Sequence, residues 1–181
     1  MDPIDSPQLS GQISRLMKNI CFFCFMGSKL RLRFYQQYPI MAIVDSVIKE
    51  KGYTFVVMFP RHSGKNELQA QIEAYLLLYY SASNAELVKV SPTWKPQSLN
   101  AMRRLERTLE GNLLTHDHWT KDEGFIFRIN TARIYFFSGQ PEANIVGATA
   151  STLLEVDEAQ DVDISKFDKD IAPMEIGRAH V

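Results

Sequence analysis

Hydrophobic residues recur along this chain in two kinds of pattern, and each kind predicts one type of secondary structure. Apolar residues at helical spacing predict helices at residues 39–52, 67–80 and 98–110. Continuous or alternating β-branched and aromatic runs predict strands at residues 53–59, 86–90, 125–129, 133–137 and 152–156. Strands that alternate with helices are typical of an α/β domain, so we expect a largely parallel sheet flanked by helices.

Two of these runs carry more specific expectations. Residues 53–59 read Tyr-Thr-Phe-Val-Val-Met-Phe, a composition that suits a central strand buried on both faces. Residues 125–129 and 133–137 are joined by Asn-Thr-Ala, which predicts a β-hairpin.

Composition and charge bound the size of the fold and the kind of partner. With 181 residues, of which 45% are hydrophobic, the chain can bury one substantial core, and a single domain is expected. The 20 basic and 21 acidic side chains give a formal net charge of −1, so attraction to nucleic acid has to come from a local patch. The best such patch is Lys95, Arg103, Arg104 and Arg107, with an ordinary solvated helix face as the alternative.

The two ends of the chain and its cysteines add little chemistry. Cys21 and Cys24 have no second Cys or His pair to complete a zinc site, which favours buried apolar thiols. The apolar run at 20–26 is too short to span a bilayer, so we expect a soluble cytoplasmic protein. Residues 1–29 are interpreted as a partly helical leader, whereas residues 176–181 match the translation of a common sequencing adapter and are set aside, an ordinary polar tail being the alternative. The expected domain is therefore 30–175, cut short at its carboxyl end.

A phosphate-binding turn is predicted between the run at 53–59 and the helix that follows it. In such a turn, backbone N–H groups and the start of a helix converge on phosphate oxygens, and a lysine adds positive charge. Ser63, Gly64 and Lys65 have this setting, but Phe59 replaces the usual first glycine and Asn66 replaces the usual Ser or Thr. A chance Gly-Lys turn at a helix start remains the alternative.

Adjacent carboxylates end the last predicted strand, at the sheet edge where open α/β sheets bind ligands. Asp157 could hold Mg²⁺, and Glu158 could orient the attacking water, as phosphoryl transfer requires. A solvated acidic loop is the alternative, because Asp161 and Asp163 follow closely. Arg61 could neutralise charge on a transferred phosphate, or could be an ordinary surface arginine.

Three segments together resemble the large terminase subunits of tailed bacteriophages. They are residues 59–67 (FPRHSGKNE), 90–97 (VSPTWKPQ) and 147–161 (GATASTLLEVDEAQD), and the resemblance covers about 30–174. It implies a P-loop NTPase core of the RecA-like kind that hydrolyses ATP with Mg²⁺ to drive double-stranded DNA into a capsid. It also implies a homo-oligomeric ring in the bacterial cytoplasm, at the capsid portal, with the portal protein and the small terminase subunit as partners.

The same resemblance assigns roles to individual residues. It implies Glu158, Arg61 and Lys65 as catalytic residues, Asp157 and Asn66 at the metal, and a nucleotide cradle made of Arg61, His62, Ser63, Gly64, Lys65 and Asn66. Residues 32–39 resemble the segment that recognises adenine, with either Gln36 or Gln37 as the amide that reads the base. The family's nuclease domain is absent from this chain, so no cleavage activity is expected.

Two other functions fit parts of the pattern. A helicase-like DNA-dependent ATPase would also suit the Ser-Pro-Thr at 91–93 and the Asp-Glu-Ala-Gln at 157–160. A non-hydrolysing nucleotide-binding interaction module would suit Asn66 and the missing first glycine. Nucleotide binding with and without Mg²⁺ separates a nucleotide site from a bare interaction domain.

Overall fold

The structure, a computed structural model, describes residues 17–143, 145 and 148–175. The first sixteen residues, with most of the predicted leader, and the adapter-like residues 176–181 lie outside this range. The larger elements are the helices α3 (Phe34–Ile48), α4 (Lys65–Tyr79) and α5 (Leu99–Gly111) and the strands β1 (Glu86–Ser91), β2 (Trp119–Asp122), β3 (Ile126–Ile129), β4 (Ala132–Ser138) and β5 (Leu153–Val156). Short helical turns complete the fold: α2 (Ile20–Phe22), η1 (Phe23–Gly27), η2 (Trp94–Ser98), η3 (Ala159–Asp161), α6 (Ile164–Lys166), η4 (Phe167–Ile171) and η5 (Ala172–Met174).

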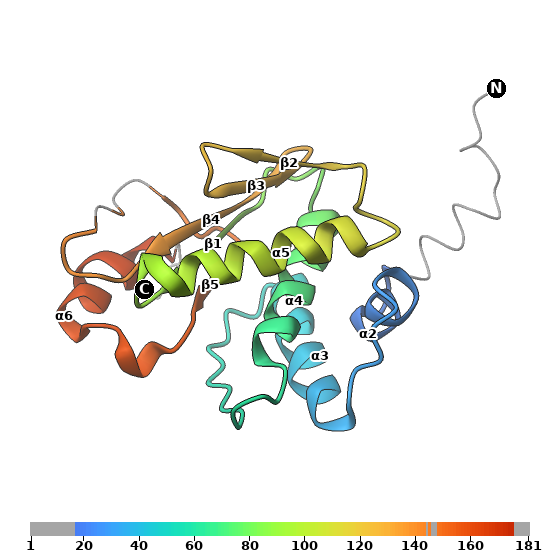
Figure 1. The fold of residues 1–181 in the computed structure, drawn as a ribbon, viewed down its shortest axis with the longest axis horizontal. Helices are drawn as coiled ribbons and strands as arrows, with labels where there is room; N and C mark the ends of the chain where they lie inside the picture. The colour runs from blue at the N-terminus through green and yellow to red at the C-terminus, as the bar shows by residue number, and fades with distance from the viewer. Residues whose placement is uncertain (1–16, 144, 146–147, 176–181) are drawn as a thin grey trace.

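An open, mixed sheet of five strands in the order β2-β3-β4-β1-β5 forms the centre of this α/β fold (Figure 1). β1 pairs in parallel with both β4 and β5, whereas β3 pairs in antiparallel fashion with both β2 and β4. The expectation of a largely parallel sheet is therefore only partly correct. The predicted hairpin is the reason, because it is confirmed as β3–β4 and extends the sheet through antiparallel pairs.

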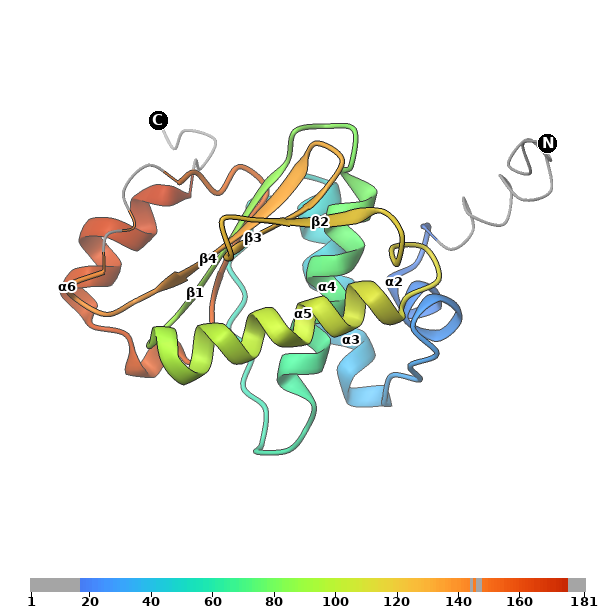
Figure 2. The same ribbon diagram turned by 45° about the horizontal axis from the view of Figure 1, so that its top comes forward.

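Both faces of the sheet are covered, and alternate residues of β1 divide between them. Leu87 packs with residues of α4 and α5 such as Leu76 and Leu105 in the larger core, whereas Val88 and Val90 belong to a second core. The second core includes Ile171 and other residues from the short C-terminal helices, which lie on the side of the sheet away from α4 and α5 (Figure 2). No helix in the described part of the chain is long and apolar enough to cross a membrane.

The N-terminal turns belong to the larger core. Ile20, Phe23 and Cys24 are at most 2% exposed, and the ring of Phe23 meets Tyr75 of α4 edge-on at 5.3 Å. The Tyr75 hydroxyl donates a hydrogen bond to the Met17 carbonyl, 2.6 Å away. Burial raises the pKa of the Cys24 thiol to about 12, as expected for a cysteine that packs as a small hydrophobe.

The helices at 67–80 and 98–110 are confirmed as α4 and α5, but the first predicted helix begins earlier than expected. α3 starts at Phe34, so Pro39 lies inside the helix rather than at its start. As the sixth residue of α3, Pro39 lacks the N–H that would bond to the Tyr35 carbonyl, so it weakens the start of the helix without ending it. The expected apolar face is present, with Ile40 and Val44 buried.

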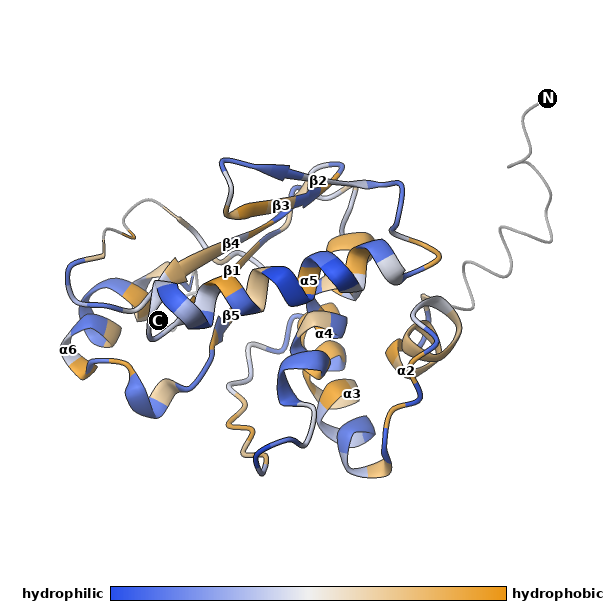
Figure 3. Ribbon diagram, in the orientation of Figure 1, coloured by the Kyte–Doolittle hydropathy of each residue, from blue (hydrophilic) through white to orange (hydrophobic). Residues whose placement is uncertain are grey.

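The strand predicted at residues 53–59 is wrong. The segment pairs with no described strand, and Val56 and Met58 are 86% and 89% exposed. Figure 3 shows hydrophobic residues in this connection between α3 and α4. β-branched and aromatic residues stabilise a strand by packing against neighbouring strands. Among the described strands β5 is an edge strand of the sheet, and residues 53–59 do not pair with it.

Candidate functional site

The turn at residues 60–64 leads directly into α4, as a phosphate-binding turn requires. Gly64 has φ of 84°, in the left-handed region that favours glycine, and caps the start of the helix. A Cβ atom at this position would lie 2.8 Å from the Gln36 amide nitrogen, so no side chain fits without a shift. Lys65 follows as the first residue of α4, where backbone N–H groups have no helical partners.

Helix α3 holds this turn in place. The Tyr35 hydroxyl and the Gln36 amide nitrogen both donate hydrogen bonds to the Ser63 carbonyl, at 3.0 Å and 2.9 Å. The Tyr35 ring also meets the Phe59 ring edge-on at 5.7 Å. The turn is therefore fixed by contacts from α3, although the strand expected to lead into it is absent.

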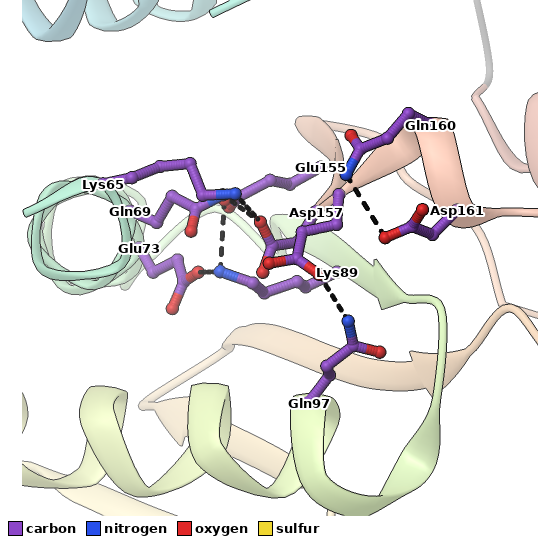
Figure 4. A network of polar contacts seen from close by, with 10 residues as sticks. Lys65, Gln69, Glu73, Lys89, Gln97, Glu155, Asp157, Gln160 and Asp161 are labelled. Carbon is purple, nitrogen blue, oxygen red and sulfur yellow. Dashed lines mark hydrogen bonds and ion pairs between the residues drawn. The ribbon is translucent and has the colours of Figure 1, made fainter. Parts of the chain in front are cut away.

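Lys65 and Asp157 are brought together across the junction between α4 and β5. The Lys65 ammonium lies 2.8 Å from Asp157 Oδ1, and the Gln69 amide approaches the same oxygen at 3.4 Å from 88 positions away in sequence (Figure 4). Burial alone would raise the pKa of Asp157, but the bond from Lys65 and the charge of Lys89 outweigh it and lower the pKa. Asp157 is thus an ionised carboxylate that is only 6% exposed.

Glu158 is the second carboxylate, and its backbone is unusual. Its φ of 47° lies in the left-handed region, which is strained for a residue with a side chain and is often found at functional sites. The half-buried Glu158 carboxylate accepts a hydrogen bond from the Gln97 amide at 2.5 Å. The oxygen of that amide accepts bonds from the backbone N–H and the hydroxyl of Thr93, so the nitrogen has to face Glu158.

Three other predicted site residues face solvent. Arg61, His62 and Asn66 are exposed and form no side-chain hydrogen bond or ion pair with the described residues. His62 also has left-handed backbone, with φ of 60°. No hydrogen bond joins Asn66 to Asp157, the other predicted metal ligand.

Gln36 and Gln37 point to different environments. The amide of Gln36 is used at both ends, because its oxygen accepts from the Arg33 N–H while its nitrogen binds the turn. Gln37 donates to the Leu32 carbonyl at 3.0 Å and lines a cavity of about 450 Å³. The other lining residues are Asn19, Cys21, Phe22, Phe25, Arg31 and Leu32.

Buried polar atoms without partners lie on the segments next to the Lys65–Asp157 pair: Ser63 precedes Lys65 by two residues, Gln69 bonds to Asp157, and Ser91 follows Val90, whose carbonyl accepts from the Asp157 N–H. Ser63 Oγ, Gln69 Oε1 and Ser91 Oγ are buried and have no hydrogen-bond partner among the described residues. Buried polar atoms of this kind call for a water, an ion or a ligand. The described residues hold no cluster of three or more His, Cys, Asp or Glu side chains, but Mg²⁺ commonly uses one or two carboxylates together with waters and substrate phosphates. Asp157 with these neighbours fits such a metal.

The four residues of the predicted basic patch differ in exposure and in ion pairing. Lys95, Arg103 and Arg107 are exposed, whereas Arg104 forms an ion pair with Glu67 of α4 at 3.0 Å. Figure 3 shows hydrophilic and hydrophobic positions alternating along α5. Met102 and Leu105 of this helix are buried, whereas Arg103 and Arg107 are exposed.

Sequence reasoning missed four polar residues at the site. Gln97 positions Glu158, and three charged residues, Glu73, Lys89 and Glu155, lie beneath Asp157. The Lys89 ammonium is 2.6 Å from Glu73 and 3.1 Å from Glu155. A signal existed for Lys89, because a lysine interrupts the otherwise apolar centre of β1, but nothing local identified its partners.

Burial raises the pKa of Glu73 from 4.5 to about 8, with Lys89 opposing the shift and Glu155 adding to it. Between pH 4.5 and about pH 8, the Glu73 carboxyl therefore keeps its proton in the folded state, whereas the same carboxyl of the unfolded chain loses it. The contribution of Glu73 to the free energy of unfolding falls as pH rises through this range. We expect the free energy of unfolding of the wild type to fall relative to Glu73→Gln between about pH 5 and pH 8, by at most about 1.4 kcal/mol per pH unit. Urea unfolding across that range measures the difference. Glu142→Gln, at an exposed position, is the control, and parallel curves for wild type and Glu73→Gln would contradict the shift.

The described site thus combines a glycine turn at a helix start, a cation on a buried carboxylate and a second carboxylate held by an amide. This arrangement suits an anionic ligand at the turn and a divalent cation beside Asp157. No family model matches this chain, and no curated protein or solved structure matches it either.

Proposed function

We propose that this chain binds ATP with Mg²⁺ at the junction of the 60–64 turn and β5, and hydrolyses it. The observation that carries the proposal is the 2.8 Å contact between Lys65 and Asp157. It joins the two halves that a phosphate-transferring site needs, a cation at a helix start and a carboxylate at a strand end. Lys65 and Asp157 are far apart in sequence, so it is the fold that brings these two groups together.

Each residue would have a distinct task. Lys65 and the N–H groups at the start of α4 would bind the phosphates, and Lys65 would then exchange Asp157 for phosphate oxygens. Asp157 would hold the Mg²⁺, which supplies charge neutralisation on the phosphates. Glu158, oriented by Gln97, would accept hydrogen bonds from the attacking water.

Adenine is assigned to the cavity beside Gln37 rather than to Gln36. The Gln36 amide is already used by Ser63 and Arg33, whereas the Gln37 oxygen has no donor among the described residues. Phe22 and Phe25 line the same cavity and offer aromatic faces for a base. Arg61 is free to turn toward the phosphates.

At a finer level, we propose a P-loop ATPase core that drives double-stranded DNA in a packaging motor. The resemblance of three ordered segments supports this role, and the exposed Lys95, Arg103 and Arg107 could contact DNA phosphates. A helicase-like ATPase is the rival, because the same residues suit it.

DNA-stimulated phosphate release separates the two. We expect Mg²⁺-dependent ATP hydrolysis by the chain to rise more with duplex DNA than with single-stranded DNA of equal length and at equal salt, since salt weakens phosphate contacts. Greater stimulation by single strands would favour the helicase-like function. Absence of hydrolysis with intact nucleotide binding would favour the non-hydrolysing module.

A further inference from the structure

A group of three ionisable side chains is buried beneath the Lys65–Asp157 pair. Lys89 of β1 is 2% exposed and Glu73 of α4 is 0% exposed, and the ammonium joins Glu73 at 2.6 Å to Glu155 of β5 at 3.1 Å. Figure 4 shows the three side chains meeting between α4 and the two strands. They tie together the elements that carry Lys65 and Asp157.

The triad and the Lys65–Asp157 pair are neighbouring layers of one interface. Lys65, Gln69 and Glu73 follow at intervals of four along α4, so they share one face of the helix. Glu155 and Asp157 are two positions apart at the end of β5, and Lys89 lies opposite Glu155 in the strand register. One face of α4 therefore contacts the sheet at two places. Lys65 and Gln69 meet Asp157, and Glu73 meets Lys89.

Packing does not require these ionisable side chains. Leu87, two positions before Lys89 on the same face of β1, is fully buried in the apolar core. Replacing a buried ionic group by apolar residues of similar volume is often neutral or stabilising, because ions lose their hydration on burial. Glu73 Oε2 in addition has no hydrogen-bond partner among the described residues, which adds a cost.

We propose that Lys89 is a positioning residue of the nucleotide site, which holds α4 against β5 by binding Glu73 and Glu155 together. This inference rests on the proposed ATP-binding function. Lys65 leaves Asp157 when phosphate arrives, and the Lys89 link then keeps Asp157 in place for the metal. The charge of Lys89 also compensates the carboxylates of Glu155 and Asp157 while Lys65 is away.

The test replaces the three ionisable groups together, so that neither the Lys89 ammonium nor a carboxylate is left in the core without its partners. The variant Lys89→Met, Glu73→Met and Glu155→Met keeps side-chain volume, and we expect it to fold with the wild-type circular dichroism spectrum. ATP affinity is measured with EDTA and with Mg²⁺. We expect affinity in EDTA to stay within about threefold of wild type and affinity with Mg²⁺ to fall by about tenfold, the loss of one charged contact.

Two further variants complete the test. The ion pair between buried Lys166 and half-buried Asp170, 2.8 Å apart in the C-terminal helices, is removed as Lys166→Met with Asp170→Met, and we expect this variant to leave both affinities unchanged. Glu155→Gln is a single, isosteric change that keeps the hydrogen bond from Lys89 to Glu73, and we expect it to fold and to show the same selective loss with Mg²⁺ on a smaller scale.

The outcomes distinguish this inference from the function on which it rests. A folded triple variant, or Glu155→Gln, that binds ATP and Mg²⁺ as the wild type does would overturn the role of Lys89 and leave the ATP site standing. A wild-type chain that binds no ATP under either condition would overturn the proposed function, and the role of Lys89 with it.

Discussion

Glu158→Gln is expected to abolish ATP hydrolysis while ATP binding is retained. The Glu158 carboxylate is half-buried and accepts a hydrogen bond from the Gln97 amide at 2.5 Å. Glu158 has left-handed backbone and directly follows Asp157. An amide can accept the same hydrogen bond from Gln97, so the geometry is preserved while the negative charge that polarises water is lost. We expect phosphate release to fall by about 10² to 10⁴-fold, the usual contribution of a general base.

Phosphate release and equilibrium ATP binding are measured on the same preparation of this variant. Asp168→Asn is the matched control, because Asp168 is an exposed carboxylate in the acidic stretch that follows and has no ion-pair partner among the described residues. Equal loss of hydrolysis in both variants would mean that the acidic stretch acts only through its total charge. Unchanged hydrolysis in Glu158→Gln would remove Glu158 from the catalytic site.

Lys65→Ala is expected to weaken ATP binding itself. Lys65 is the cation at the start of α4. Its side chain is 30% exposed and its ammonium already lies beside a carboxylate, so a phosphate oxygen can reach it. Losing one charged hydrogen bond corresponds to about 10- to 100-fold in affinity. The variant also leaves Asp157 without its nearest cation, which we expect to lower the thermal midpoint.

Calorimetric titration with ATP and thermal unfolding measure these two effects. Lys169→Ala, at an exposed lysine outside the site, is the control for a general change in surface charge. Wild-type affinity in Lys65→Ala would show that the turn at 60–64 does not bind phosphate, whatever the stability of the variant.

Local patterns predicted the elements that depend on local physics. The apolar spacing of α4 and α5 is preserved because each helix buries one face against the sheet, with residues such as Leu76 and Leu105 fully buried. The hairpin followed from its two alternating runs, and the end of β5 followed from the apolar run before Asp157. The sequence placed Lys65 and Asp157 in one site, and the 2.8 Å contact brings them together, although a direct contact was not predicted.

The errors come from features that depend on distant partners. The residues of 53–59 have strong β-propensity, but a strand needs a neighbour, and the described chain provides none. The early start of α3 was missed because Pro39 resembled a helix start. Lys89 acquires its role through Glu73 and Glu155, 16 and 66 positions away in sequence, and Gln97 acquires its role through Glu158, 61 positions away.

Equilibrium binding of ATP to the wild-type chain and to Lys65→Ala, each with Mg²⁺ and with EDTA, tests the nucleotide site most directly. We expect the wild type to bind ATP, to bind it more tightly with Mg²⁺, and to lose most of this affinity in the folded Lys65→Ala variant. No detectable binding by the wild type, or equal affinity in the two proteins, would contradict an ATP site between α4 and β5.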